Sequence, residues 1–220
     1  MRARGFSTRL DDLPATLPVF PLPGVLLLPG GRLPLNIFEP RYLAMFDDAL
    51  ASNRLIGMIQ PSAGQEQATA PDLYPTGCAG RIVRFSETED GRYLITLLGV
   101  ARFDASSEVE SMRGYRRVIP SWDAFHRDLD DAGVAGIDRD RLMAALRGYF
   151  ERLGIKADWE AIERTEDSQL VTTLAMLCPF DPTEKQALLV AASPVDRAET
   201  MIALMEMALH PTDGTDNARH

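Results

Sequence analysis

Six prolines between residues 18 and 40 constrain this chain more than any other feature of its 220-residue sequence. Each proline fixes φ and lacks a backbone N–H, so no helix can run through residues 17–39. Short apolar runs separate the prolines, a pattern that is typical of buried extended segments. Gly30-Gly31 indicates a tight turn between two of these segments. The folded part of the chain is therefore expected to begin with extended structure.

The hydrophobic period changes at Pro40. This proline suits the first position of a helix, and Glu39 before it can meet the free N–H groups of the first turn. Three apolar side chains then follow at helical spacing, namely Leu43, Phe46 and Leu50. The pattern predicts strand, turn, strand and helix over residues 17–50, with the helix near residues 40–52.

The next seventy residues alternate between strand patterns and turn signals. The strand patterns cover residues 55–59, 78–85, 93–99 and 115–120. Asp90-Gly91 is a turn signal that joins the second and third of them as a hairpin. Five to seven strands are expected within residues 17–122, which indicates a compact barrel-like β unit carrying one helix.

After Trp122 the sequence changes to helical patterns with capping residues. Asp138 can cap a helix over residues 139–153 that ends at Gly154. Further helix starts are expected at Asp158, Ser168, Asp181 and Ser193. The expected organisation is a flexible leader (1–16), a β-rich subdomain (17–122), a linker (123–137), a helical subdomain (138–210) and a flexible tail (211–220). The expected fold class is α+β, with a β-rich unit followed by a C-terminal helical bundle.

Three separated pieces of the sequence resemble the Lon-protease N-terminal, or substrate-binding, domain. They are LPVFPLPGVLLLPGGRLPLNIFEPRY from Leu17, GCAGRI from Gly77, and DGR at Asp90 followed by LGVARF from Leu98. The resemblance implies a PUA-like β-rich unit, and it runs to the last helix near Leu209. The matching positions, which we interpret as structural, are Pro21, Pro23, Gly24, Pro29, Phe38, Glu39, Pro40, Arg41, Tyr42, Gly77, Gly80, Gly91, Arg102 and Phe103.

The charge distribution disfavours anionic partners. The net charge is −9, and residues 123–220 hold 10 Lys and Arg against 19 Asp and Glu, whereas residues 17–122 are nearly balanced. An acidic half of this kind argues against nucleic acid and against anionic membrane surfaces. No apolar signal segment and no run long enough to span a bilayer is seen, so we expect a cytoplasmic protein.

The sequence offers no constellation typical of catalysis. The only lysines are Lys156 and Lys185, and neither follows the Gly-rich loop that an ATPase needs. The three histidines are too far apart for metal-ligand spacing, and the two cysteines are expected to be buried thiols. We therefore expect no catalytic residues, no cofactor and no metal, as in a stand-alone Lon-like domain without ATPase and peptidase domains.

The resemblance implies a non-enzymatic module that binds unfolded or apolar polypeptide segments, as an adaptor or regulator in protein quality control beside a separate protease. Sheet edges, and a groove between the β unit and the helices, are the candidate surfaces. One alternative is a small hydrolase or thiol-dependent enzyme around Cys78, which a close approach of His126 would favour. Another is a scaffold for one specific folded partner.

The sequence also predicts which side chains form the core. Six apolar residues are expected to be buried together, namely Phe20, Ile37, Phe38, Phe46, Ile82 and Leu97. If Phe38 is fully buried, its replacement by alanine should cost about 3–5 kcal/mol.

Overall fold

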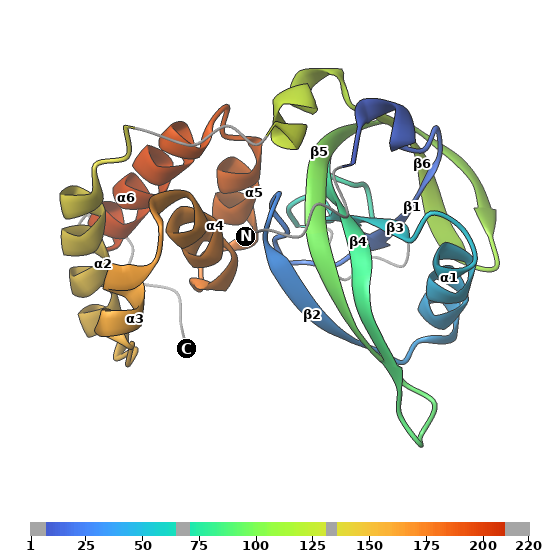
Figure 1. Ribbon diagram of the computed structural model, residues 1–220, viewed down its shortest axis with the longest axis horizontal. Helices are drawn as coiled ribbons and strands as arrows, with labels where there is room; N and C mark the ends of the chain where they lie inside the picture. The colour runs from blue at the N-terminus through green and yellow to red at the C-terminus, as the bar shows by residue number, and fades with distance from the viewer. Residues whose placement is uncertain (1–7, 65–70, 131–135, 210–220) are drawn as a thin grey trace. The chain divides into compact units, whose positions relative to one another are not determined.

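The computed structural model describes residues 8–64, 71–130 and 136–209 (Figure 1). It contains one six-stranded sheet followed along the chain by a helical region, so the predicted α+β class is confirmed. The expected tail at residues 211–220 and residues 1–7 of the expected leader lie outside the described residues. The described part of the leader includes a short 3-10 helix, η1 (Leu10–Asp12). Among the helices of the described ranges, none is both long and apolar enough to cross a membrane.

The sheet is built around its longest strand, β5. The strands are β1 (Leu17–Pro21), β2 (Arg32–Ile37), β3 (Leu55–Ile59), β4 (Thr76–Glu87), β5 (Tyr93–Met112) and β6 (Tyr115–Ser121). Their order is β2-β5-β4-β3-β1-β6, and β5 also pairs with β6. One edge of β5 pairs with β4. The opposite edge pairs with β2 through the first residues of β5 and with β6 through its last residues. Five strands thus form a closed circuit, and β2 lies outside that circuit.

The proline-rich segment folds as its sequence predicts. β1 runs parallel to β3 and antiparallel to β6, and β2 begins after the turn at Gly30-Gly31. Leu26, Leu27 and Leu28 are buried between them without forming a strand. The backbone of this turn lies against β5, because a Cβ placed on Gly99 would be 1.9 Å from the carbonyl oxygen of Leu28. Only glycine fits at that position.

Helix α1 (Pro40–Leu50) begins at the predicted proline. Tyr42 and Phe46 form its buried face and contact Phe20 of β1, with ring centroids 4.3 and 6.5 Å from that of Phe20. Its exposed face is attached to the strands through carboxylates, since Tyr115 and Tyr93 donate to Asp48 and Asp47. The aromatic contacts fix the helix on the sheet, as expected from its apolar spacing.

Phe103 occupies the centre of the strand core. Its side chain is fully buried, and the core cluster around it comprises Leu17, Val19, Leu55, Ile59, Ala79 and Val118. A Cβ on Gly57 or Gly77 would lie 2.8 or 2.7 Å from the phenyl ring of Phe103. Trp122 packs against the ring edge-on, with centroids 5.8 Å apart. The ring thus takes the volume that side chains at these two glycines would need.

The core prediction is wrong for one of its six residues. Phe20, Ile37, Phe46, Ile82 and Leu97 are all buried, but Phe38 is 63% exposed. Alternation explains the difference, because Ile37 takes the inward position at the end of β2 and the next residue cannot share it. Phe38 therefore adds to the apolar surface of the protein.

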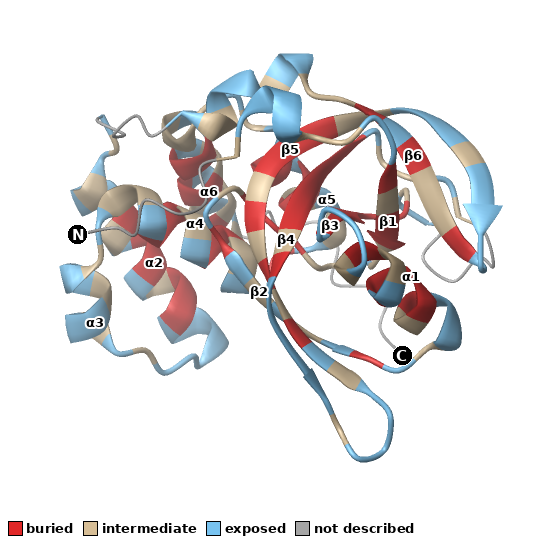
Figure 2. Cartoon of the chain, turned by 45° about the vertical axis from the view of Figure 1, so that its right-hand side comes forward, coloured by how far each residue is buried: buried red, intermediate tan, exposed pale blue. Residues whose placement is uncertain are grey.

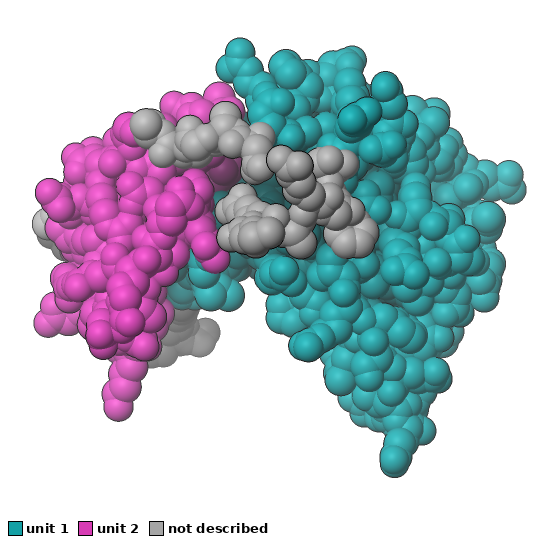
Figure 3. All heavy atoms as spheres, viewed as in Figure 1, with its two compact units in different colours: residues 1–132, 172–190 teal, residues 133–171, 191–220 magenta. Residues whose placement is uncertain are grey.

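The chain divides into two compact units that do not follow the boundary expected at residue 123 (Figure 3). Unit 1 comprises residues 1–132 and 172–190, and unit 2 comprises residues 133–171 and 191–220. Residues 123–129 of the expected linker form a 3-10 helix, η2 (Asp123–Leu129). The chain therefore passes between the units three times, and part of the helical region belongs with the strands.

Helix α5 (Pro182–Val190) is attached to the strands of unit 1 through buried polar groups. Gln60 donates to the Pro182 carbonyl oxygen at 2.9 Å and accepts from the Gly24 N–H at 3.0 Å. Gln186 donates to the Thr76 carbonyl oxygen at 3.1 Å. Lys185 donates to the Gly24 carbonyl oxygen at 2.7 Å. Buried polar groups need such partners, so these bonds specify where α5 lies within the unit.

Arg102 of β5 connects η2 and α5 to the sheet. Its guanidinium makes a two-bonded contact with the Asp128 carboxylate, at 2.8 Å for each bond, and donates to the Leu189 carbonyl oxygen at 3.0 Å. The side chains of this ion pair are 5% and 10% exposed. The guanidinium also lies 4.5 Å from the ring centroid of Phe125. One buried side chain thus joins three elements of unit 1.

Unit 2 contains α2 (Arg139–Leu153), α3 (Trp159–Arg164), α6 (Pro194–Leu209) and the start of α4 (Asp167–Leu177). Asp138 and Asp158 cap α2 and α3 as predicted, and Gly154 ends α2 in the left-handed conformation. The prediction that Ser168 caps α4 is wrong by two residues, because α4 begins at Asp167 and Ser168 lies inside the helix, where it bonds Glu166.

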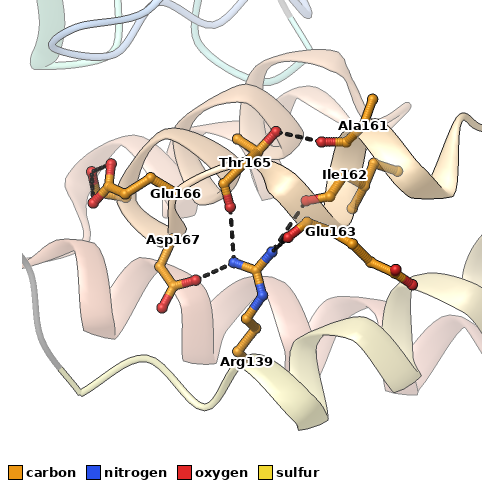
Figure 4. A network of polar contacts seen from close by, with 8 residues as sticks. Arg139, Ala161, Ile162, Glu163, Thr165, Glu166 and Asp167 are labelled. Carbon is orange, nitrogen blue, oxygen red and sulfur yellow. Dashed lines mark hydrogen bonds and ion pairs between the residues drawn. The ribbon is translucent and has the colours of Figure 1, made fainter.

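A single side chain holds the end of α3 in place. Arg139 donates to the carbonyl oxygens of Ile162, Glu163 and Thr165 at 2.8–3.1 Å, and it pairs with Asp167 (Figure 4). Carbonyl groups at the end of a helix have no partner inside that helix. Arg139 supplies these partners from the first position of α2, so it stabilises the turn between α3 and α4.

Candidate functional site

The outer edge of β2 is an open strand edge. The Gly99 N–H donates to the Gly31 carbonyl oxygen at 2.8 Å, and the same register continues along β2 and β5. Because bonded and non-bonded pairs alternate in an antiparallel ladder, Leu33, Leu35 and Ile37 point their backbone groups toward β5. The backbone groups of the alternate residues point the other way: Arg32, Pro34 and Asn36.

This edge is available for pairing. All three of these residues are exposed, and their outward backbone groups make no hydrogen bond within the described part of the chain. Pro34 has no N–H to offer, which suits an edge position and lowers the number of free donors. The edge therefore presents the N–H groups of Arg32 and Asn36 together with three carbonyl oxygens.

The outer face of β2, β5 and β4 lies beside this edge. Pro34, Thr96 and Arg84 form one row across the three strands, and Asn36, Leu94 and Ser86 form the next. These rows face outward, because Ile95 between them and Leu97 beyond the first row are buried on the other face. Leu94 is 45% exposed although it is apolar. An apolar patch thus lies among polar side chains on this face.

The same face is hollowed. A pocket of about 570 Å³ is lined by Pro34, Leu35, Asn36, Arg84, Ser86, Leu94, Ile95 and Thr96. The pocket is shallow and open to solvent, and its volume falls in the range of ligand sites in proteins. A continuous strand edge and a pocket of this size therefore adjoin each other, with residues of β2 contributing to both.

The polar side chains that line this pocket make no polar contacts with other described residues. Asn36, Arg84, Ser86 and Thr96 make no side-chain hydrogen bond or ion pair with any described residue. The nearby Arg81 behaves differently, since it donates to the Asn53 carbonyl oxygen and to Thr8. The pocket thus offers a guanidinium, an amide and two hydroxyl groups to a bound molecule.

Apolar side chains are also exposed on the hairpin formed by β4 and β5. The outer ends of these strands are mainly exposed (Figure 2). Phe85 is 42% exposed and contacts Tyr93 edge-on, with ring centroids 4.9 Å apart. Val83, the extra residue where the register shifts between Ile82 and Arg84, is 43% exposed. Phe85 pairs with Ile95, so by alternation its ring lies on the opposite face of the sheet from the pocket.

The positions that carry the family resemblance occupy several places in unit 1. Gly77, Gly80, Arg102 and Phe103 lie in the buried part of β4 and β5, whereas Gly24 and Gly91 occupy turns with φ of +70° and +77°. Pro21 ends β1, Pro23 and Pro29 lie in turns, and Pro40 begins α1. The pocket residues do not include these positions.

Glu39, Arg41 and Tyr42 form a small cluster at the start of α1. The Arg41 guanidinium donates to Glu39 at 3.0 Å and lies 4.5 Å from the centroid of the Tyr42 ring. Burial raises the pKa of Tyr42, and the neighbouring Arg41 acts in the opposite direction. The Glu39 side chain makes no capping bond to the helix. The arrangement accounts for the geometry of the helix start without any bound molecule.

The residues of the thiol-enzyme hypothesis lie in different environments. Cys78 is buried in β4, and its thiol donates to the Ala79 carbonyl oxygen at 3.7 Å. His126 lies on η2, where its Nδ1 atom is 3.0 Å from the Asp123 carbonyl oxygen in an exposed position. Neither side chain lines the 570 Å³ pocket beside β2, which we call the β2 pocket. Within the described ranges, no group of three or more His, Cys, Asp or Glu side chains has metal-binding geometry.

The buried cysteines are expected to be unreactive. Burial raises the pKa of the Cys178 thiol to about 12, with Lys185 acting weakly in the opposite direction. At pH 8 about one thiol in ten thousand would then be ionised. With dithionitrobenzoate at pH 8, we expect no rapid reaction of the folded protein and release of two equivalents after unfolding in guanidinium. A fast equivalent from the folded protein would contradict the burial of the thiols.

The comparison with known families decides the classification. The family model of the "ATP-dependent protease La (LON) substrate-binding domain" matches residues 16–207. The chain belongs to this family. Among curated proteins, it is 28% identical over 204 residues to the Lon protease of Elusimicrobium minutum, covering 89% of this chain and 24% of that protein. It is also 26% identical over 197 residues to Lon protease 2 of Myxococcus xanthus. The chain thus spans about a quarter of the length of these relatives.

Solved structures of Lon N-terminal domains share the fold. The Lon N-terminal domain protein from Xanthomonas campestris matches with a TM-score of 0.60 and 24% identity, covering 86% of this chain and 97% of that one. The N-terminal domain of the Mycobacterium avium complex Lon protease matches with a TM-score of 0.58 and 15% identity. At these identities the comparison establishes the fold and not the site.

Sequence reasoning about this Lon-family domain missed the pocket. Its lining comes from β2, β4 and β5, and only the pairing register brings those residues into two rows. One signal was present, because Pro34 interrupts the alternating Leu33 and Leu35. A proline inside a strand pattern indicates an edge strand. The sequence could therefore have identified the open edge, although not the hollow beside it.

Proposed function

We propose that this Lon-family domain is a non-enzymatic module that binds extended, apolar segments of other polypeptides along β2. The observation that carries the proposal is the open edge of β2 beside the 570 Å³ pocket. The family description supports it, because it names a substrate-binding domain. We further propose an adaptor or regulator role in protein quality control, in which the module presents such segments to a separate protease.

The binding mechanism is strand addition. An incoming segment pairs its backbone with the outward N–H and C=O groups of β2. This pairing provides affinity that does not depend on the side chains of the segment. Alternate side chains of that segment point toward the outer face of the sheet, where Pro34 and Leu94 offer apolar contact. The affinity is expected to be weak, with a Kd on the order of micromolar or above, because a short free segment loses conformational entropy on binding.

Removing the open-edge donors should weaken peptide binding about tenfold. Arg32→Pro with Asn36→Pro deletes both outward N–H groups but no donor to β5, and each hydrogen bond contributes about 0.5–1.5 kcal/mol. The control is Arg32→Ala with Asn36→Ala, which removes the same side chains and keeps both N–H groups. Fluorescence anisotropy with a labelled, unfolded model protein measures the affinity of each variant.

Three outcomes are informative. Equal affinity of the proline and alanine variants, at unchanged thermal stability, would exclude strand addition at β2. Binding that disappears at high salt would contradict an apolar contact, because salt screens charges and does not weaken apolar burial. Equally tight binding of a folded control protein would favour the alternative, a scaffold for one specific folded partner.

A further inference from the structure

We propose that the β2 pocket selects segments in which an apolar residue is flanked by aspartate or glutamate. This inference rests on the proposed function and specifies its substrate class. It runs against the net charge of −9, which by itself would favour basic partners. Local charge at the site, and not the total charge of the chain, determines the preference.

Arg84 is the first observation. It occupies the same row as Pro34 and Thr96, and Leu94 lies in the next row. Since neighbouring strands are about 4.8 Å apart, the Arg84 backbone lies roughly 10 Å from that of Pro34. A segment added along β2 lies one strand further out, so its backbone is roughly 14 Å from that of Arg84. Extended arginine and glutamate side chains together can span this distance, so the segment can place an apolar side chain on Pro34 and Leu94 while its carboxylate meets the Arg84 guanidinium.

The second observation is that the Arg84 guanidinium has no polar partner among the described residues. Arg84 makes no hydrogen bond or ion pair with any residue that the structure describes, and the same holds for Arg32 on the open edge. Several other arginine side chains of unit 1 have carboxylate partners, whereas Arg81 donates to the Asn53 carbonyl oxygen and to Thr8. Examples are Arg41 with Glu39, Arg92 with Asp90, Arg102 with Asp128 and Arg113 with Asp48. Both arginines near the pocket are thus available to an incoming anion.

The third observation is the chemistry of the lining. No aspartate or glutamate lines the pocket, and its remaining polar side chains are the Asn36 amide and the Ser86 and Thr96 hydroxyls. All three can donate hydrogen bonds to a carboxylate, as the Arg84 guanidinium can in a two-bonded geometry. A lysine of the client would meet an uncompensated positive charge here. The lining therefore favours acidic residues and disfavours basic ones.

The test uses three fluorescent peptides of equal length with one shared apolar core. Their flanking residues are glutamate, glutamine or lysine. At low salt we expect the intact protein to bind the glutamate peptide about fivefold more tightly than the glutamine peptide, and the lysine peptide least tightly. Arg84→Glu should reverse the order, so that the lysine peptide binds best. This gain of binding cannot result from misfolding.

Arg152→Glu is the matched control. Arg152 is exposed on α2 in unit 2 and makes no ion pair with described residues. Its replacement by glutamate changes the charge of the protein by the same amount as Arg84→Glu. It should leave the peptide preference unchanged. Equal affinity for the glutamate and glutamine peptides, or a preference that survives Arg84→Glu, would overturn the inference and leave apolar binding intact. Failure to bind any of the three peptides would overturn the proposed function as well.

Discussion

Asp128→Ala is expected to lower the free energy of unfolding by about 3–5 kcal/mol, because it leaves the buried Arg102 guanidinium without a counter-ion. The pair has side chains that are 5% and 10% exposed, and two bonds of 2.8 Å join them. Leu189 would remain as a neutral acceptor, which cannot balance the charge. Chemical denaturation followed by circular dichroism measures the loss.

Two further variants separate the buried charge from general damage. Replacing both partners, as Arg102→Met with Asp128→Ala, should cost less than the single change, since no buried charge is left unpaired. Glu160→Ala removes a carboxylate from an exposed pair with Arg164 and should leave the denaturation midpoint unchanged. A double variant as unstable as the single one would show that packing, and not charge, controls stability at this site.

Phe103→Ala is expected to cost about 3–5 kcal/mol, because the ring is fully buried at the centre of the core and its loss leaves a cavity. Gly57 and Gly77 carry no side chains that could fill this cavity. The matched control is Phe38→Ala, which removes a ring that is 63% exposed and should change stability by less than about 0.5 kcal/mol.

The same denaturation experiment compares the two phenylalanine variants directly. A shift of the Phe103→Ala midpoint no larger than that of Phe38→Ala would contradict the position of the core. Phe38→Ala also has a functional readout, because Phe38 follows β2 in the chain. Its effect on peptide affinity would report whether the client reaches beyond Ile37.

Local signals in the sequence predicted the elements well where one residue determines the backbone. Pro40 begins α1, Asp138 and Gly154 bound α2, and Asp90-Gly91 turns the hairpin. The cause lies in the chemistry of those residues, which holds in almost any tertiary context. Ser193 is a further case, since its hydroxyl accepts from the Asp196 N–H at 3.1 Å at the start of α6.

Features that depend on contacts between distant residues could not be predicted in this way. Arg102 was noticed as part of a motif, but its partners Asp128 and Leu189 lie 26 and 87 residues later. Residues 123–129 looked like a linker because they are acidic, but Asp128 and Phe125 attach them to the buried Arg102 of β5. The β2 pocket likewise depends on a register shift in β4 that sequence alone does not specify.

The late position of Leu189 has a consequence for synthesis of the chain on the ribosome. At about 5–20 residues per second, the 87 residues between Arg102 and Leu189 take roughly 4–17 s to translate. During that interval Arg102 can pair with Asp128, whereas Gln60 and Gly24 still lack their α5 partners. A nascent chain that pauses within residues 133–171 therefore carries an incomplete strand unit. That is the stage at which we expect chaperones to bind it and proteolysis to compete with folding.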